Sequence, residues 1–230
     1  MTDEDFLSLC ERLRRMGTAV TSDVLGEMGL RNQVLSSTIR PLGEPVVAGP
    51  AFCVRGERTD KPHRIAFEMD RQLSTDAIVV LATGEYQESA VIGGNIALSF
   101  RLHGAQAVVT DGGIRDGGEF AEAGLPVFCR FRSPLAPKGR WSYTEIGQAV
   151  TLPGQAGAAV TVRPGDILHG DGDGLVVVPR EHLAQVVRDA EEVDRIENRI
   201  KQALRDGADR EAAYADNPRF AHIRKPEPSR

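Results

Sequence analysis

Apolar residues recur at helical spacing near the N-terminus, and short apolar runs follow in the middle of the chain. Residues 3–15 place their apolar side chains on one face, which predicts a packing helix with Thr2 or Asp3 as its N-cap. Ser22 and Asp23 precede a second short apolar run. We interpret them as the caps of a short helix rather than as catalytic residues.

The next part of the chain has the patterns of β-structure. Between residues 34 and 57, apolar runs separated by Pro and Gly predict several short strands. A helix is expected at residues 64–73, and His63 before it is interpreted as a loop histidine. Residues 77–82 read Ala-Ile-Val-Val-Leu-Ala. A strand without any charge is expected to be buried on both faces of a sheet.

A stretch of 24 residues, 93–116, combines helical and strand patterns with candidate chemistry. Its glycine pair, residues 93–94, opens an apolar helical run, and residues 107–109 then predict a short buried strand. This strand ends in a glycine-rich turn that carries Arg115 beside Asp116. Because the strand runs back along the helix, both ends of the stretch are expected to meet at one edge of a sheet.

Two kinds of binding group would meet at that edge. Backbone N–H groups at the start of a helix bind anions, and the Asp116 carboxylate can hold a cation. The stretch therefore predicts a pocket for a small carboxylate and a divalent metal ion. The residues alone also allow a simpler interpretation. Asp-Gly-Gly is a common turn, and neighbouring Arg and Asp usually form a solvated surface pair.

A second segment rich in glycine and aspartate, residues 163–179, predicts two strands joined by a tight turn. Asp171 and Asp173 have the spacing of two ligands of a calcium loop, but the glutamate and the other ligand positions of such a loop are missing. Calcium binding is therefore not expected. We interpret His169 as a turn residue rather than a metal ligand.

The apolar pattern ends with a long helix at residues 181–205, which has a narrow apolar stripe between many charges. Such a helix is expected to pack along the body while its outer end reaches solvent or a neighbouring subunit. Gly207 ends the helix, and the proline-containing residues 208–230 predict a weakly held tail. The chain is therefore expected to form one domain, residues 1–207, followed by this tail.

Composition narrows the class of protein. The 230 residues include 28 basic and 33 acidic ones, interspersed, so no basic face is predicted for nucleic acid or anionic lipid. Cys10, Cys53 and Cys129 are widely spaced among mostly apolar neighbours, which is typical of reduced thiols in a cytosolic protein. The chain has no basic leader and no apolar run long enough to cross a membrane. We therefore expect a soluble, cytoplasmic protein.

Taken together, the motifs resemble the family of ribonuclease-activity-regulator A (RraA) proteins and hydroxymethyl-oxoglutarate aldolases. The resemblance covers residues 18–207 and rests on Thr-Ser-Asp-Val-Leu at 21–25, Gly-Pro-Ala at 49–51, Gly-Gly-Asn-Ile at 93–96, Asp-Gly-Gly-Ile-Arg-Asp at 111–116, Pro-Val-Phe at 126–128 and the segment 164–179. It implies an α/β three-layer sandwich with a swivelling β/β/α-type core and a long C-terminal helix. It also implies a homotrimer, or a homohexamer made of two trimers, with active sites between subunits.

The resemblance assigns roles to residues of the central stretch. Arg115 matches the arginine that contacts the 2-oxo oxygen of the substrate, and Asp116 matches the carboxylate that holds Mg²⁺ or Mn²⁺. Asn95 and Ile96 match positions whose backbone amides bind the substrate carboxylate, and Gly94 belongs to the same substrate-binding segment. Many aldolases of this family have an acidic residue where this chain has Gly94. A contact to the water ligands of the metal is therefore absent here or supplied by another residue.

The end of the long helix adds one catalytic candidate. Glu197 matches a glutamate that approaches the metal-bound waters of the adjacent subunit in this family, where it would transfer a proton. Two other glutamates, Glu191 and Glu192, are interpreted as solvated partners of basic residues on the same helix. Those basic residues are Arg188, Arg195 and Lys201.

These assignments favour a metal-dependent lyase that acts on a short 2-oxo acid through a pyruvate enolate. The metal would chelate the substrate carboxylate and 2-oxo oxygen, and Arg115 would stabilise the negative charge that develops on that oxygen. Aldol cleavage of 4-hydroxy-4-methyl-2-oxoglutarate requires a base, whereas decarboxylation of oxaloacetate does not, and both reactions stay open. The alternative is a non-catalytic, protein-binding regulator, although such a protein has no need of Arg115 beside Asp116.

Overall fold

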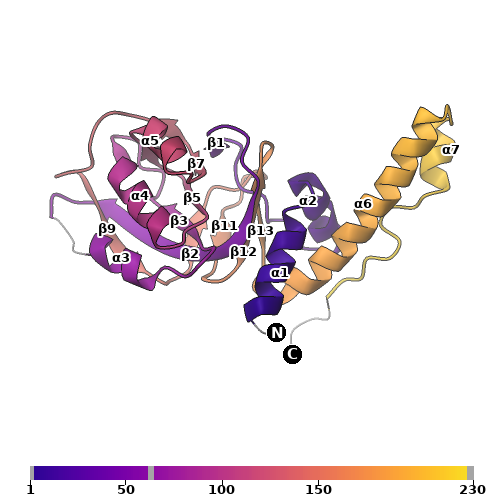
Figure 1. Ribbon diagram of the computed structural model, residues 1–230, viewed down its shortest axis with the longest axis horizontal. Helices are drawn as coiled ribbons and strands as arrows, with labels where there is room; N and C mark the ends of the chain where they lie inside the picture. Colours follow the sequence, from indigo (N-terminus) through magenta and orange to yellow (C-terminus); the bar gives the residue numbers. More distant parts are fainter. Residues whose placement is uncertain (1–2, 62–64, 227–230) are drawn as a thin grey trace.

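The computed structural model describes residues 3–61 and 65–226, so the predicted cap Thr2 and the predicted loop histidine His63 lie outside the described residues. Figure 1 shows a sheet-based body that carries short helices on one side and a second group of helices at its other end. The helices of the body are α3 (Ala66–Gln72), α4 (Gly94–Leu102) and α5 (Gly117–Glu122). The helices of the other end are α1 (Asp3–Leu13), α2 (Thr18–Glu27), α6 (Leu183–Arg205) and α7 (Arg210–Ala215), with a 3₁₀ turn η1 (Arg180–His182) before α6.

The main sheet has eight strands in the order β1-β7-β5-β3-β2-β12-β13, with β9 paired to the second half of β2. Its central strands run parallel, and β1, β9, β12 and β13 join antiparallel. The strands are β1 (Arg40–Pro41), β2 (Val47–Arg58), β3 (Ile78–Ala82), β5 (Ala107–Thr110), β7 (Val127–Cys129), β9 (Trp141–Ile146), β12 (Ile167–Asp171) and β13 (Gly174–Val178). Two smaller units are the parallel sheet of β4 (Ala90–Ile92), β6 (Gly113–Ile114) and β8 (Phe131–Arg132), and the hairpin of β10 (Val150–Leu152) and β11 (Val160–Val162).

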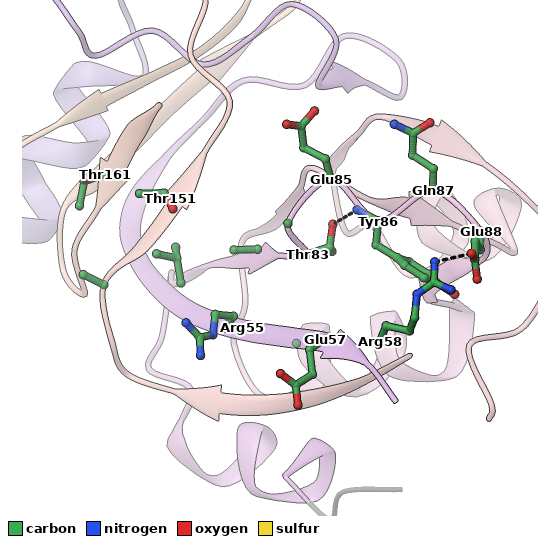
Figure 2. A pocket seen from close by; sticks show the side chains of 15 residues that line it. Arg55, Glu57, Arg58, Thr83, Glu85, Tyr86, Gln87, Glu88, Thr151 and Thr161 are labelled. Carbon is green, nitrogen blue, oxygen red and sulfur yellow. Dashed lines mark hydrogen bonds and ion pairs between the residues drawn. The ribbon is translucent and has the colours of Figure 1, made fainter. Parts of the chain in front are cut away.

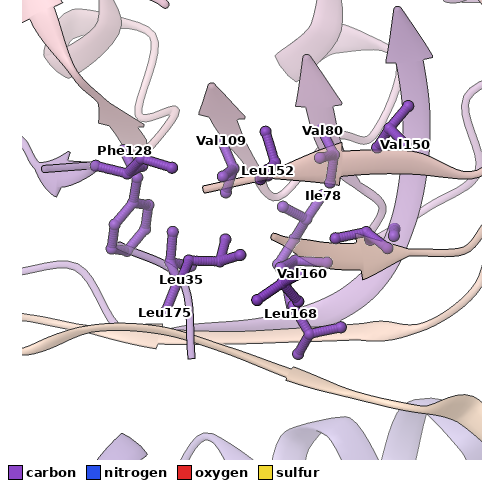
Figure 3. Close-up of a cluster of buried hydrophobic side chains, with 14 of the residues drawn as sticks. Leu35, Ile78, Val80, Val109, Phe128, Val150, Leu152, Val160, Leu168 and Leu175 are labelled. Atoms are coloured by element: carbon purple, nitrogen blue, oxygen red, sulfur yellow. The ribbon is translucent and has the colours of Figure 1, made fainter. Parts of the chain in front are cut away.

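The strand β3 lies between two hydrophobic cores, as its uncharged sequence predicts. Ile78 and Val80 face a core that the β10–β11 hairpin covers (Figure 3), whereas Val79 and Leu81 face α3, α4 and α5. A third core joins the outer face of β12 and β13 to α1, α2 and α6. The protein is thus an α/β fold of stacked layers, as expected.

The prediction of several short strands between residues 34 and 57 is only partly correct, because β2 is one strand of 12 residues. Gly49 and Pro50 lie inside it rather than in a turn. A side chain at position 49 would collide with the Asp76 carbonyl, so this glycine permits a close backbone approach. Pro50 stands where β2 leaves β12 and begins to pair with β3 at Ala51. Gly49 and Pro50 therefore mark the point where β2 changes its neighbouring strand, and not the end of the strand.

The interpretation of Ser22 and Asp23 as helix caps is wrong, since both lie inside α2. The helix begins at Thr18, and its cap comes from β12: Asp171 accepts hydrogen bonds of 2.8 Å from the Thr18 backbone N–H and from its hydroxyl. Burial opposes ionisation of Asp171, but these hydrogen bonds lower its pKa. A cap supplied by a residue 153 positions away leaves no local pattern in the sequence.

The predicted hairpin at residues 163–179 is confirmed as β12 and β13, but His169 is not a turn residue. It lies within β12, is fully buried, and its Nδ1 atom is 3.0 Å from the Thr21 hydroxyl. Burial lowers the pKa of His169 to about 4, although Asp171 and the backbone of Met16 act in the opposite direction.

The long C-terminal helix is confirmed as α6. The segment after Gly207, predicted as a weakly held tail, contains α7, whose Ala213 packs against Ile196 and Ile200 of α6. Farther along, Phe220 and Ile223 pack against the core that α1, α2 and α6 share. A good part of this segment is therefore held by apolar contacts.

Two further expectations concern the whole chain. The three cysteines are free and buried, as predicted, and burial raises the pKa of Cys10 and Cys129 to about 11 and that of Cys53 to about 12. Such thiols are poor nucleophiles near neutral pH. Within residues 3–61 and 65–226, no helix is long and apolar enough to cross a bilayer.

Candidate functional site

The two ends of the central stretch meet at the edge of the small parallel sheet, as predicted. β4 and β6 are neighbours, with Ala90 opposite Gly113 and Ile92 opposite Ile114, and the Arg115 N–H donates to the Ile92 carbonyl at 3.0 Å. α4 starts directly after β4, and α5 starts directly after β6. The carboxyl ends of two adjacent strands and the N-termini of two helices therefore converge, which is the usual place for a ligand in α/β proteins.

Asp116 stands at the centre of this edge. Its Oδ2 atom lies 3.3 Å from the Arg115 Nε atom and accepts a hydrogen bond of 3.3 Å from the Gly94 N–H. Asp116 has φ 56°, ψ 41°, a left-handed conformation that costs energy for a residue with a side chain. Its side chain is 37% exposed, so solvent and a ligand can reach the carboxylate.

The glycine pair makes room for these side chains. A Cβ atom at Gly93 would lie 2.8 Å from both the Arg115 Nε and the Asp116 Oδ2 atoms. A Cβ atom at Gly94 would collide with the Glu119 carboxylate and lie 2.7 Å from the Glu119 Cβ atom. Glu119 therefore belongs to this edge, although the sequence analysis missed it. Its spacing of three residues from Asp116, at the start of a helix, is the signal that could have found it.

The backbone amides at the start of α4 are unequal as donors. The Gly94 N–H is taken by Asp116, and the Ile96 N–H donates to the Gly93 carbonyl at 3.1 Å. The Asn95 N–H makes no hydrogen bond within the described part of the chain. Among the three candidates of this segment, Asn95 therefore offers the open amide for an anion.

A cavity of about 540 Å³ opens beside Arg115 and Ile96. Val91, Trp141 and Tyr143 form an apolar wall, and the Tyr143 hydroxyl is occupied by a 2.7 Å hydrogen bond to the Val91 carbonyl. Lys61 and Lys138 add positive charge to the same cavity, along with the acidic Asp60. A small organic acid fits this mixture of apolar surface and cationic groups.

A larger cavity, of about 750 Å³, lies between β2 and the loop that follows β3 (Figure 2). Its charged side chains are largely neutralised: Arg58 pairs with Glu88, Glu85 with Arg130, and Arg55 with Glu145. Among the described residues, none that line it has a buried polar side-chain atom without a partner. The smaller cavity is therefore the better candidate.

Asp111, the first residue of the predicted turn, has a structural role. It is buried and accepts hydrogen bonds from the Thr83 N–H at 2.7 Å and the Glu85 N–H at 2.8 Å. These contacts fix the loop after β3, which forms a wall of the larger cavity.

Glu197 does not join the site within one chain. α6 packs against α1, α2 and α7, at the opposite end of the molecule from α4 and α5 (Figure 1). The Glu197 carboxylate accepts a 3.0 Å hydrogen bond from Arg219 and lies 3.6 Å from the Lys201 Nζ atom. Only a second copy of the chain could bring Glu197 to Arg115.

The two neighbouring glutamates of α6 have different partners. Glu192 pairs with Arg195 on its own helix, as predicted. Glu191 instead accepts two hydrogen bonds, of 2.8 and 2.7 Å, from Arg12 of α1, so the prediction of a partner on the same helix is wrong. This contact fastens α1 to α6.

The donor set at the edge fits a hard divalent cation. The Asp116 carboxylate lies beside Gly93 and Gly94, and the Glu119 carboxylate lies beside Gly94. Both can approach because these two residues have no side chain. Within residues 3–61 and 65–226, no cluster of three or more His, Cys, Asp or Glu side chains could enclose a metal. A cation held by few protein ligands and several waters is the mode that Mg²⁺ favours.

Comparison with known proteins adds relatives to this geometry. Residues 18–177 match the RraA-like family, described as Aldolase/RraA. A protein of Halalkalibacterium halodurans named "Putative 4-hydroxy-4-methyl-2-oxoglutarate aldolase" is 34% identical over 215 residues, 93% of this chain and 90% of that protein. An uncharacterized protein of Methanocaldococcus jannaschii is 35% identical over 130 residues, 56% of this chain and 59% of that relative's own length. The crystal structure of Streptomyces coelicolor RraAS2, an unusual member of the RNase ES inhibitor RraA protein family, has the same fold, with a TM-score of 0.71 at 24% identity over 83% of this chain and 95% of that chain.

Proposed function

Because this chain belongs to the RraA-like family of aldolases and RraA proteins, we propose that it is a divalent-metal-dependent lyase that breaks a carbon–carbon bond in a short 2-oxo acid. One observation carries the proposal: Arg115 lines a cavity, and the Asp116 carboxylate lies 3.3 Å from its Nε atom. The open Asn95 amide directly precedes Ile96, which lines the same cavity. Arg115, Asp116 and Asn95 provide a cationic group, a cation-binding group and an anion-binding group. A 2-oxo acid with a cation bound to it presents the three complementary groups.

Each residue has a distinct task in this reaction. Asp116 would hold Mg²⁺ or Mn²⁺, which supplies positive charge against the 2-oxo acid and orients it. The Asn95 N–H and the start of α4 bind the substrate carboxylate. The Arg115 guanidinium faces the 2-oxo oxygen, where negative charge gathers when the bond between C3 and C4 breaks. The pair of electrons released is then taken up by a proton at C3, which yields pyruvate.

The other product decides whether a base is needed. Aldol cleavage requires removal of a proton from the 4-hydroxyl group, whereas decarboxylation releases carbon dioxide without such a step. The geometry at Arg115 and Asp116 serves both reactions. We therefore include aldol cleavage and oxaloacetate decarboxylation in the proposal.

The proposal is tested by pyruvate release. Purified protein is expected to form pyruvate from 4-hydroxy-4-methyl-2-oxoglutarate or oxaloacetate when Mg²⁺ or Mn²⁺ is added, and to lose this activity in chelator, because the positive charge of Arg115 alone cannot replace that of the cation. A coupled lactate dehydrogenase assay measures the product. Activity must return when excess metal is restored. Absence of metal-dependent turnover on any 2-oxo acid would favour a non-catalytic regulator that binds another protein.

Glu197 of a neighbouring copy is the proposed carrier of the proton in aldol cleavage, in a homotrimer or a hexamer of two trimers. Glu197→Gln is expected to reduce aldol cleavage strongly while oxaloacetate decarboxylation continues, because only the former needs a base. Glu192→Gln is the matched control, since Glu192 already pairs with Arg195 on α6. Both rates are measured alongside sedimentation velocity. A fully active monomer, or equal loss of both reactions, would contradict this role.

A further inference from the structure

Glu119 lies at the edge of the candidate site, and its carboxylate has no role in the proposed reaction. It is the third residue of α5, and its carboxylate lies over Gly94, at the start of α4. Asp116 meets the same segment, since it accepts the Gly94 N–H. Two carboxylates from the start of α5 therefore face the first residues of α4.

The surroundings of Glu119 are unusual for a structural glutamate. The residue is exposed, and within the described ranges its side chain makes no hydrogen bond or ion pair. Its position three residues after Asp116 would suit a capping box, yet the N-cap Asp116 has no side-chain cap hydrogen bond, and none is formed by Glu119. Its lone pairs are thus available to a ligand beside Asp116.

The absence of a side chain at position 94 has a physical cause in this arrangement. A Cβ atom there would occupy the place of the Glu119 carboxylate. A side chain at position 94 and the observed Glu119 conformer exclude each other. The glycine is therefore matched to Glu119, and only one of the two positions can present a carboxylate in that space.

We propose that Glu119 is a positioning residue of the site: its carboxylate accepts hydrogen bonds from the water ligands of the divalent cation that Asp116 holds, in the space over Gly94. Mg²⁺ and Mn²⁺ sites with one or two carboxylates keep several waters, and groups that bind these waters fix the orientation of the ion. This inference rests on the proposed function for its setting, but it concerns metal binding and not turnover.

The first test measures Mn²⁺ binding by calorimetry in the absence of substrate. Glu119→Gln keeps the size of the side chain but removes its charge and replaces one acceptor oxygen with an NH₂ donor, and it is expected to weaken Mn²⁺ binding about 10-fold or more. Glu122→Gln, on the exposed end of the same helix, is the matched control and is expected to leave the affinity unchanged. The melting temperatures of both variants in chelator report on any purely structural role.

The second test transfers the carboxylate from α5 to α4, while keeping it in the space over Gly94. The double variant Gly94→Asp with Glu119→Gly places an acidic side chain on α4 in the space that Glu119 vacates, and is expected to recover most of the Mn²⁺ affinity lost by Glu119→Gly alone. Gly94→Asp alone is expected to distort the edge, because its Cβ atom meets Glu119. Recovery by the double variant would mean that Mn²⁺ affinity depends on a carboxylate in that space, whichever helix carries it. No recovery would mean that the loss in Glu119→Gly comes from a change in α5.

The outcomes separate this inference from the proposed function. Equal Mn²⁺ affinity of wild type and Glu119→Gln overturns the inference even if turnover depends on metal. Weaker binding by Glu119→Gln supports it even if no 2-oxo acid is turned over. A wild-type protein that binds no Mn²⁺ at all overturns the inference as well.

Discussion

Replacement of Arg115 with lysine is expected to lower kcat/KM for pyruvate formation about 100-fold, although the charge is kept. Arg115 has a fixed place: its Nε atom lies 3.3 Å from Asp116, and the glycine at position 93 allows this approach. Among the described residues, the remaining nitrogens of the planar guanidinium have no partner, so they can address the 2-oxo oxygen and its neighbours together. A lysine ammonium is a single point of charge on a flexible stem and cannot serve both Asp116 and the substrate.

The measurement is a steady-state rate at saturating metal, with each substrate that the wild type accepts. Arg55→Lys is the matched control, because Arg55 lines the larger cavity and pairs with Glu145 in an exposed position. It is expected to retain the wild-type kcat/KM. If Arg55→Lys loses activity and Arg115→Lys does not, the reaction takes place in the larger cavity and the assignment of the site is wrong.

The parts of the fold that followed from the sequence are those determined by local patterns. The short uncharged run of β3, the glycine–aspartate turn of the β12–β13 hairpin and the helical spacing of apolar residues in α6 are each signals within one stretch of sequence. The meeting of Asp116 with the start of α4 also followed, because a helix and a returning strand fix the positions of their ends.

The errors share a cause of a different kind, since each depends on contacts between distant parts of the chain. Asp171 of β12 caps α2, so Ser22 and Asp23, predicted as caps, lie inside the helix instead. Gly49 and Pro50 indicate a turn by local rules, yet β2 continues through them because β12 and then β3 pair with it. Rules that consider only neighbouring residues in the sequence cannot detect such distant partners.

The candidate site shows the same division. A sequence motif predicts Arg115 and Asp116 as site residues. Which backbone N–H group can bind an anion depends on which of these groups already make hydrogen bonds in the fold. The spacing of Glu119 from Asp116 is visible in the sequence, but its contact with Gly94 is evident only once α5 is folded against α4. The role proposed for Glu197 depends on a second copy of the chain, so it requires an assembly as well as a fold.

His169 provides the second large expected effect, on stability rather than on activity. Its ring is fully buried in β12, between Thr21 and the carboxylate of Asp171 that caps α2. Burial lowers its pKa from 6.5 to about 4, so between these values the unfolded chain binds a proton that the folded protein does not. Unfolding free energy therefore increases with pH across this window and is lost as the pH falls from about 6.5 towards 4.

The expected size of this loss is about 2 to 3 kcal/mol between pH 7 and pH 4.5, since each unit of pKa difference corresponds to about 1.4 kcal/mol. The pKa of Asp171 is lowered instead, so its contribution is lost only at lower pH, below the range of unfolded carboxyl groups. His169 therefore accounts for the upper part of the acid transition. The replacement His169→Asn removes the titrating group and is expected to flatten this part of the profile.

The measurement is urea unfolding at pH 7, 6, 5.5, 5 and 4.5, in chelator so that bound metal does not contribute. His169→Asn is expected to be less stable than wild type at pH 7, because it leaves space in a packed core, but to lose much less stability on acidification. His103→Asn is the control, because His103 is exposed at the end of α4 and should leave the wild-type slope intact. Parallel profiles for wild type and His169→Asn would mean that the buried ring does not govern acid stability, and the acid transition would then have to come from the carboxylates alone.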